Sequence, residues 1–253
     1  GVAPILPWGA PNAQRLRRDF LIPAAAGLVT AALAFAFGLT HPLVLLTVGL
    51  AGMATVSTLR ELLLPVGARA SKRSTSWWSN LMPVLSGNRR RTGGYIVHLG
   101  VIGVAVAISV SSSYRSTLEV SLAPGESAVL AGYTLQYIET RAEEEPHRFA
   151  VGAQVQVTTP SGEELRMVPK LTFYPRQREP ITTPHVRTLG LSDLYLSLVA
   201  YDRDTQRASI KAFVIPLVPV LWWSMPIMVL GSVFSLWPRR RRVHRPTGAE
   251  VPA

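Results

Sequence analysis

The strongest constraint in the sequence is an apolar stretch that directly follows a run of arginines. After the arginines at 89–91, the 18 residues 93–110 contain only two ionisable side chains, those of Tyr95 and His98. At about 1.5 Å per residue, a helix of this length can cross a hydrocarbon core of about 30 Å. A histidine at membrane depth is costly unless it is paired or ligated. His98 is therefore the first candidate for a functional residue.

The composition is typical of a membrane protein. Of the 253 residues, 48% are apolar and 16% are charged, whereas roughly 25% are charged in soluble domains. Lysine and arginine outnumber acidic residues by 15 to three in segments 1–19, 60–92 and 237–253 taken together. Residues 113–213 contain 11 lysines and arginines and 12 acidic residues. The net charge of +11 therefore flanks the apolar runs, as the positive-inside rule describes, and argues against a nucleic-acid-binding face.

Four apolar runs predict a multi-span helical membrane protein with both termini in the cytoplasm. The predicted transmembrane helices lie at about 20–38, 43–59, 93–110 and 214–236. Residues 1–112 would hold a cytoplasmic lead-in and three of the helices, and residues 214–253 the fourth helix and a basic cytoplasmic tail. Segment 76–85, which contains two tryptophans, would form an interfacial helix or a loop at the membrane edge.

Residues 113–213 have a different pattern, with turn residues and apolar side chains at a period of two. Alternation at 153–158 and at 194–201 predicts β-strands, and Pro124-Gly125 marks a turn between strands. We expect an inserted antiparallel β domain of about six to eight strands outside the membrane. The chain contains no cysteine, so it can perform no thiol chemistry itself. It shows no signal peptide and opens on Gly1, which indicates a piece of a larger polypeptide.

The helical period predicts what surrounds His98. Gly94, Val101 and Ala105 share its face, and the small side chains of Gly94 and Ala105 would let a flat group approach. On the opposite side, small residues at 100, 103 and 107 would suit a neighbouring helix. Imidazole is a common haem ligand, and an apolar setting suits a low-spin haem b. The alternative, of equal weight from the helix alone, is a histidine bonded to a serine or carbonyl of another helix.

The chain does not supply an obvious second axial ligand. His41 is predicted at the outer surface and His98 in the inner half of the membrane, a depth difference of roughly 15–20 Å. A second ligand would therefore come from another polypeptide or from a missing part of this one. His147, His185 and His244 are interpreted as ordinary surface histidines, because their spacing matches no metal site.

The string Asn-Arg-Arg-Arg-Thr-Gly-Gly-Tyr-Ile-Val-His-Leu-Gly at 88–100 resembles the signature of the CcmF family of haem lyase subunits. Further similarity lies at 1–8, 132–135, 173–175 with 193–195, and 216–231. The resemblance covers nearly the whole chain but only about the C-terminal third of the family. Thr92 stands where an aromatic residue is usual, and Trp223-Ser224-Met225-Pro226 is less regular than the family's run of tryptophan and glycine.

The resemblance implies a role in the bacterial inner membrane, in the complex that attaches haem covalently to apocytochrome c. It implies that His98 is an axial ligand to the iron of a transmembrane haem b that reduces the incoming haem with electrons from quinol. The second axial histidine, a periplasmic histidine pair and a tryptophan-rich WWD segment would belong to the N-terminal part of CcmF. Other implied partners are a CcmH-type subunit, the haem chaperone CcmE, apocytochrome c and membrane lipids. No catalytic acid, base or nucleophile is assigned, and the fragment alone is expected to be inactive.

Three alternatives to a haem lyase remain open at this stage. The four-helix layout with an outer domain is also similar to the ResB subunit of the other cytochrome c synthesis system. A membrane-anchored assembly adaptor would use His98 only to hold helices together. A cytochrome b subunit dedicated to electron transfer would bind haem without taking part in cytochrome c maturation.

Overall fold

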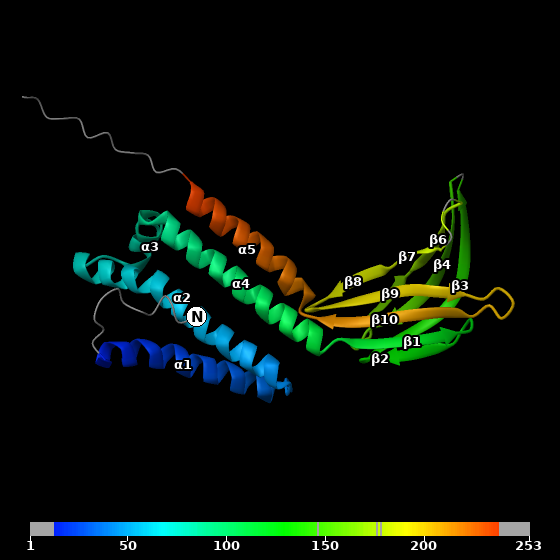
Figure 1. Cartoon of the computed structure of the whole chain (residues 1–253), viewed down its shortest axis with the longest axis horizontal. Helices are drawn as coiled ribbons and strands as arrows, with labels where there is room; N and C mark the ends of the chain where they lie inside the picture. Colours follow the sequence, from blue (N-terminus) through cyan, green and yellow to red (C-terminus); the bar gives the residue numbers. More distant parts are fainter. Residues whose placement is uncertain (1–12, 146, 176, 178, 238–253) are drawn as a thin grey trace, which may run out of the picture.

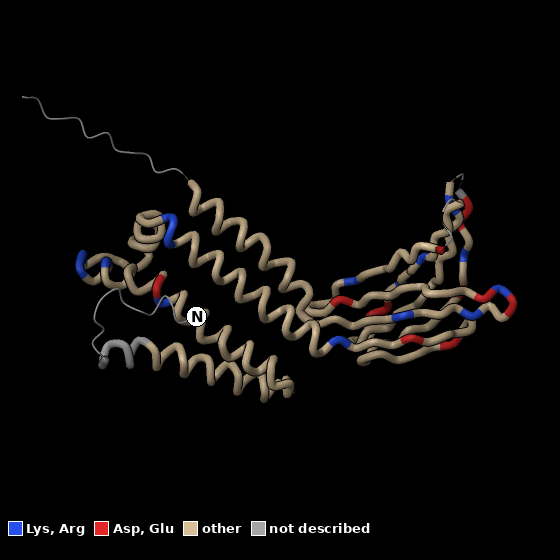
Figure 2. The backbone as a smooth tube through the Cα atoms, viewed as in Figure 1, with Lys and Arg blue, Asp and Glu red and all other residues tan. Residues whose placement is uncertain are grey.

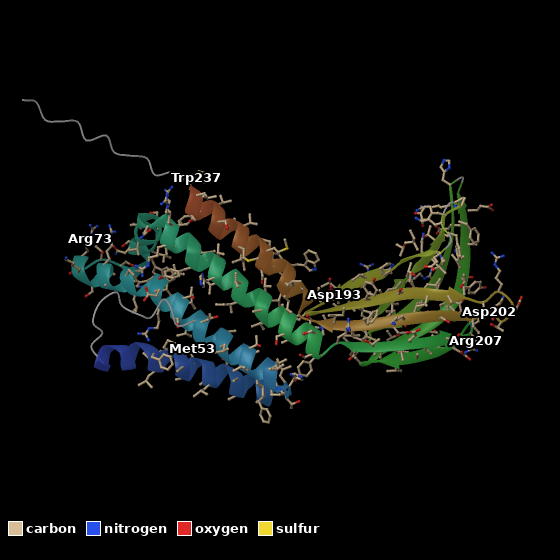
Figure 3. The ribbon with its side chains drawn as sticks, viewed as in Figure 1. Met53, Arg73, Asp193, Asp202, Arg207 and Trp237 are labelled. Atoms are coloured by element: carbon tan, nitrogen blue, oxygen red, sulfur yellow. The ribbon has the colours of Figure 1, made fainter. Side chains whose placement is uncertain are left out.

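The computed structural model describes residues 13–145, 147–175, 177 and 179–237, and it places long helices at one end and a β domain at the other (Figure 1). Helix α4 leads directly into the first strand, and the last strand leads directly into α5. In Figure 3, Asp193 lies at this junction, whereas Arg73 and Trp237 lie at the far end of the helices. The helices therefore hold the β domain through two short connections.

The described helical part consists of four long helices and one short one. Their bounds are α1 (Ala13–Ala36), α2 (Pro42–Arg73), α3 (Trp77–Gly87), α4 (Arg89–Ser113) and α5 (Val218–Leu236). The long helices lie in a row in the order α1, α2, α4, α5, and α3 packs against α2 and α4 (Figure 1). Apart from α3, which packs against α2 and α4, no other helix of the described chain covers the two broad faces of this row.

Within the residues that the structure describes, three helices, α2, α4 and α5, are long and apolar enough to cross a membrane. In α1, the part with described side chains, Phe20–Ala36, is a shorter apolar helix, so a fourth crossing stays a prediction. At most 22% of any of the three apolar stretches is buried within the chain. In Figure 2, the charged residues of the helical part gather at the end away from the β domain.

Helices α2 and α4 extend beyond the predicted spans 43–59 and 93–110, because local helix signals continue past the apolar stretches. Helix α2 continues past Arg60 to Arg73, where Ser74 adopts a left-handed conformation and ends it. Helix α4 begins before the glycine pair, because the Asn88 side chain accepts a hydrogen bond from the Arg91 backbone N–H at 3.3 Å. Residues 77–85 of the segment 76–85 lie within the helix α3 and Ser76 is its N-cap residue, so the segment is not a loop.

The predicted helix at 214–236 was wrong at its start. Residues 214–216 complete the last strand, and α5 begins at Val218. Leu217 separates the two with a positive φ of 60°, and its N–H donates to the carbonyl oxygen of Leu191 at 2.7 Å. The first predicted helix likewise ends at Ala36 rather than at 38, and Gly38 has a φ of +90°.

The β domain is built of two antiparallel sheets. Its strands are β1 (Ser116–Leu122), β2 (Ser127–Leu130), β3 (Tyr133–Glu145), β4 (Arg148–Thr158), β5 (Glu164–Met167), β6 (Lys170–Phe173), β7 (Ile181–Thr183), β8 (His185–Leu189), β9 (Ser192–Tyr201) and β10 (Ala208–Pro216). One sheet has the order β1-β10-β9-β8, and the other β2-β3-β4-β6-β7 with β5 beside β4. The described residues thus contain ten strands, more than the six to eight predicted, since several are too short to show an alternating pattern.

The core of this domain lies between the two sheets. Leu194, Leu196 and Leu198 of β9 are each at most 1% exposed and face the buried valines of β4. The predicted alternation therefore holds up to Leu198 but not at Ala200, which is exposed. The register between β9 and β10 shifts there, between Ser209 and Ile210, and the extra residue reverses the side-chain direction.

Candidate functional site

Helix α4, which carries His98, packs closely against α5 through glycines. A Cβ atom built on Gly231 would lie 2.8 Å from the carbonyl oxygen of Gly93, and one built on Gly100 would lie 3.0 Å from that of Ser224. Such close approach of two backbones is typical of small residues at helix interfaces in membranes. Ala107 on the same side is 1% exposed. The predicted small-residue face is therefore the packing face of α4.

The opposite face of α4, which carries His98, is open. His98 and Ala105 are exposed, and the side chains of Val101 and Ile108 are 51% and 53% exposed. A Cβ atom built on Gly94 would have no atom within 4 Å. The row of helices explains this openness, because α2 and α5 flank α4 and leave its broad face uncovered. The structure thus places the exposed His98 and Ala105 on one strip with the half-buried Gly94, beside which there is free space.

The imidazole of His98 has one hydrogen-bond contact within the described chain. Its Nδ1 lies 3.2 Å from the carbonyl oxygen of Gly94, one turn earlier in the same helix. Because a carbonyl can only accept, Nδ1 must carry the hydrogen, and in a neutral ring the lone pair then resides on Nε2. Metal-binding histidines are commonly oriented by such a bond from the other nitrogen. In the part of the chain with described side chains, no hydroxyl of a neighbouring helix caps this ring.

The other histidines that the structure describes, His41, His147 and His185, do not lie near His98. The backbone N–H of His41 donates to the Tyr114 hydroxyl at 2.8 Å, which places His41 beside the last turn of α4. Tyr114 is 16 residues after His98, a separation of about 24 Å along a helix. His147 is exposed in the β3–β4 turn, and His244 lies outside the described residues. Among the residues that the structure describes, no three histidine, cysteine, aspartate or glutamate side chains form a metal-binding group.

His185 is more than the surface histidine predicted. Its Nδ1 accepts a hydrogen bond from the backbone N–H of Val168 at 3.0 Å, which connects β8 of one sheet to the segment between β5 and β6 of the other. Burial lowers the pKa of His185, and the positive charge of Arg187 lowers it further. The ring is therefore a structural acceptor in its neutral form.

One polar cluster near the start of α4 was missed by the sequence interpretation. Arg91 forms an ion pair with Glu61 of α2, and its Nε lies 3.3 Å from the Tyr95 hydroxyl. That hydroxyl lies 3.4 Å from the Glu61 carboxylate, and the guanidinium also lies over the Tyr95 ring at 5.5 Å. The sequence contains a signal for this cluster. Glu61 is the only acidic residue in the sequence of α2, α3, α4 and α5, and an acidic residue in such apolar helices needs a partner.

The fold defines a class: helices suited to a membrane that carry an antiparallel β-sandwich between the last two of them. Residues 113–216 match a family model described as the CcmF C-terminal β-sandwich. The resemblance of the chain to the C-terminal portion of CcmF is thereby confirmed.

Known relatives extend this similarity over almost the whole chain. The chain is 26% identical to the probable cytochrome c-type biogenesis protein NrfE of Escherichia coli over 235 residues. That alignment covers 90% of this chain and 40% of NrfE. The chain is also 25% identical to the cytochrome c-type biogenesis protein CycK of Rhizobium meliloti over 248 residues. That alignment covers 97% of this chain and 36% of CycK. The chain therefore spans about 40% or less of the length of these relatives.

A solved structure has the same fold. The structure of the cytochrome c haem lyase CcmF matches with a TM-score of 0.73 and 24% identity, over 94% of this chain and 37% of that one. At this level of identity the match concerns the fold alone. It includes both the helices and the β-sandwich, since it covers nearly all residues.

Proposed function

We propose that this chain is the C-terminal portion of a haem lyase that attaches haem to apocytochrome c, and that His98 is an axial ligand of a haem b. The reaction would join the haem vinyl groups to the two thiols of a Cys-X-X-Cys-His motif, and both thiols belong to the substrate. The observation that carries the proposal is the open strip around His98 in a chain whose relatives are cytochrome c-type biogenesis proteins.

The residues present fit such a group. The Nδ1–H of His98 is directed to the Gly94 carbonyl, so Nε2 is the nitrogen that remains to bind iron. Gly94 has free space where a larger side chain would stand, and Ala105 is exposed further along the strip. When bound, a haem b supplies a one-electron redox couple whose potential depends on its ligands and on burial. The chain itself would hold the haem, orient the imidazole and exclude water with Val101 and Ile108.

A second axial ligand would come from the upstream part of the polypeptide. Within the described chain, His41 is the only other histidine of the helical part, and it lies about 24 Å from His98 along α4. The exposed faces of the helix row offer the surface on which additional helices could pack. This arrangement also agrees with the chain covering 40% or less of its relatives.

We further propose four membrane crossings, with the β domain on the extracytoplasmic side and the arginine-rich end of α4 in the cytoplasm. The distribution of charge supports this orientation, because basic residues gather at the helix ends away from the β domain (Figure 2). The domain would then contribute to the surface on which haem, a haem chaperone such as CcmE and apocytochrome c meet. A CcmH-type subunit and quinol would complete the system.

The test is an absorption spectrum of the intact complex, purified with the upstream polypeptide, for the wild type and the His98→Ala variant. We expect the variant to lose a low-spin b-type signal while the complex still assembles. His41→Ala is the matched control and should leave the spectrum unchanged, since only the backbone of His41 makes a described contact. Added imidazole should restore part of the signal in His98→Ala.

Other outcomes favour other functions. A wild-type complex without haem would support an assembly adaptor, and an unchanged spectrum in His98→Ala would reject the ligand. Haem binding combined with normal cytochrome c maturation in a strain lacking the protein would favour a plain electron-transfer subunit.

A further inference from the structure

A pocket of about 250 Å³ lies among α2, α3 and the start of α4, and its lining does not include Gly94, His98 or Ala105. Its polar walls include Arg69 and Glu61 of α2, Asn88, and Arg91 of α4. Pro65 of α2 and the α3 segment 83–85 form apolar walls. Ligand pockets for larger molecules typically measure about 300–1,000 Å³, so this volume suits a head group rather than a whole cofactor.

Arg69 is the residue in this pocket that lacks a partner. Its Nε is buried and makes no hydrogen bond, and within the described residues its side chain has no ion pair either. Arg69 follows Glu61 by eight residues, so both lie on the same side of α2 and both line the pocket. A buried guanidinium nitrogen without an acceptor is unusual and indicates an acceptor that the described part of the chain does not provide.

The charge of the pocket favours an anion. The single carboxylate, that of Glu61, is already paired with Arg91 and lies near the Tyr95 hydroxyl. Arg69 therefore leaves the pocket with one uncompensated positive charge. Guanidinium groups bind phosphate through paired N–H donors, and such charge-assisted hydrogen bonds are among the stronger ones.

We propose that this pocket binds a phosphate group, with Arg69 as its principal donor and Arg91 as a second cation. The apolar wall formed by Pro65 and residues 83–85 favours the phosphodiester of an anionic membrane lipid, whose glycerol would lie against it. Free inorganic phosphate offers the same chemistry without the apolar part. The proposal is independent of haem and does not rest on the proposed function.

The experiment measures lipid binding to the intact complex by native mass spectrometry, with short-chain phosphatidylglycerol as the probe. A diacylglycerol with the same chains lacks the phosphate and should not bind at this site. Arg69→Gln should weaken phosphatidylglycerol binding about tenfold, in line with the loss of a charge-assisted hydrogen bond. Arg90→Gln is the matched control: it removes the same charge from an exposed arginine that does not line the pocket, and binding should be unchanged.

Glu61→Gln provides a second variant with the opposite expectation. It removes the competing negative charge and frees Arg91, so phosphatidylglycerol should bind more tightly than in the wild type. This variant keeps the proposal testable even if Arg69→Gln does not fold. Binding of inorganic phosphate in place of the lipid would identify free phosphate as the source and still support the site. Equal binding in the wild type, Arg69→Gln and Glu61→Gln would overturn the proposal.

Discussion

Gly93 of α4 and Gly231 of α5 face each other so closely that each occupies the space of the other's missing Cβ. A Cβ on Gly231 would lie 2.8 Å from the Gly93 carbonyl oxygen, and a Cβ on Gly93 would overlap the Gly231 carbonyl oxygen. Real Cβ atoms essentially never approach other heavy atoms below 3.0 Å. The pair therefore fixes how closely α5 is held against α4.

Gly93→Ala should destabilise the α4–α5 pair by about 1–3 kcal/mol, because the added methyl must separate two backbones rather than shift a flexible side chain. The loss should be visible as a lower midpoint when the chain is unfolded by sodium dodecyl sulfate in mixed micelles. Gly94→Ala is the matched control at the next position, where a Cβ meets nothing within 4 Å. Equal midpoints for the two variants would show that the close approach does not determine stability.

The two faces of α4 illustrate what the sequence could predict. Helical periodicity places Gly100 and Ala107 opposite His98, and the structure packs that side against α5. Periodicity cannot predict that the helices form a single row, because that depends on which helices pack together. The exposure of the His98 side therefore had to come from the structure. The same holds for Arg91 with Glu61, which are 30 residues apart in sequence.

A second prediction concerns the tight turn between β2 and β3. The pairing of Leu130 with Tyr133 leaves Ala131 and Gly132 as a two-residue loop, and both have positive φ, 49° and 85°. Two-residue loops of this kind strongly prefer Asn-Gly, since alanine is strained in this conformation. Ala131→Asn should stabilise the β domain by about 0.5–1 kcal/mol. Urea unfolding of the full chain in micelles, followed by circular dichroism, would measure this.

Gly132→Ala provides the comparison at the other loop position. It introduces strain at a φ of +85° and places a methyl 3.2 Å from Cγ of Pro160. It should destabilise the domain by roughly 1–2 kcal/mol. A loss of stability in Ala131→Asn, or none in Gly132→Ala, would contradict this description of the turn.

A third prediction concerns the contact between the α1–α2 connection and the end of α4. The Tyr114 hydroxyl accepts the His41 backbone N–H at 2.8 Å, across 73 residues of sequence. Tyr114→Phe removes this acceptor and should cost about 0.5–1.5 kcal/mol, towards the lower value since the contact is exposed. Faster hydrogen exchange should follow in the peptide around residue 41. Peptides from the C-terminal half of α5, which packs against residues 93–100 near the other end of α4, serve as the internal control.

The boundaries between strand and helix were the least predictable part of the fold, and α5 shows the physical reason. Apolar side chains at 214–216 suit a membrane helix as well as a buried strand, so composition cannot separate them. Residues 214–216 form a strand because they pair with β9, where Val214 lies opposite Leu194. The positive φ of Leu217 then separates this strand from α5. Neither is encoded locally.

The last prediction is a pH dependence that depends on His185. Burial lowers the pKa of this ring below its ordinary value near 6.5, and the charge of Arg187 lowers it further. As pH falls through about 6.5, the unfolded chain takes up a proton before the folded one does, so the free energy of unfolding decreases. The loss stops below the folded-state pKa, where both states are protonated. The protonated ring also cannot accept the hydrogen bond from the Val168 N–H.

Urea midpoints of the wild-type chain should therefore fall between pH 8 and pH 5. The variant His185→Asn keeps an acceptor oxygen but does not titrate, so it should lose this part of the pH dependence. Parallel curves for the two proteins would mean that other groups cause the acid sensitivity.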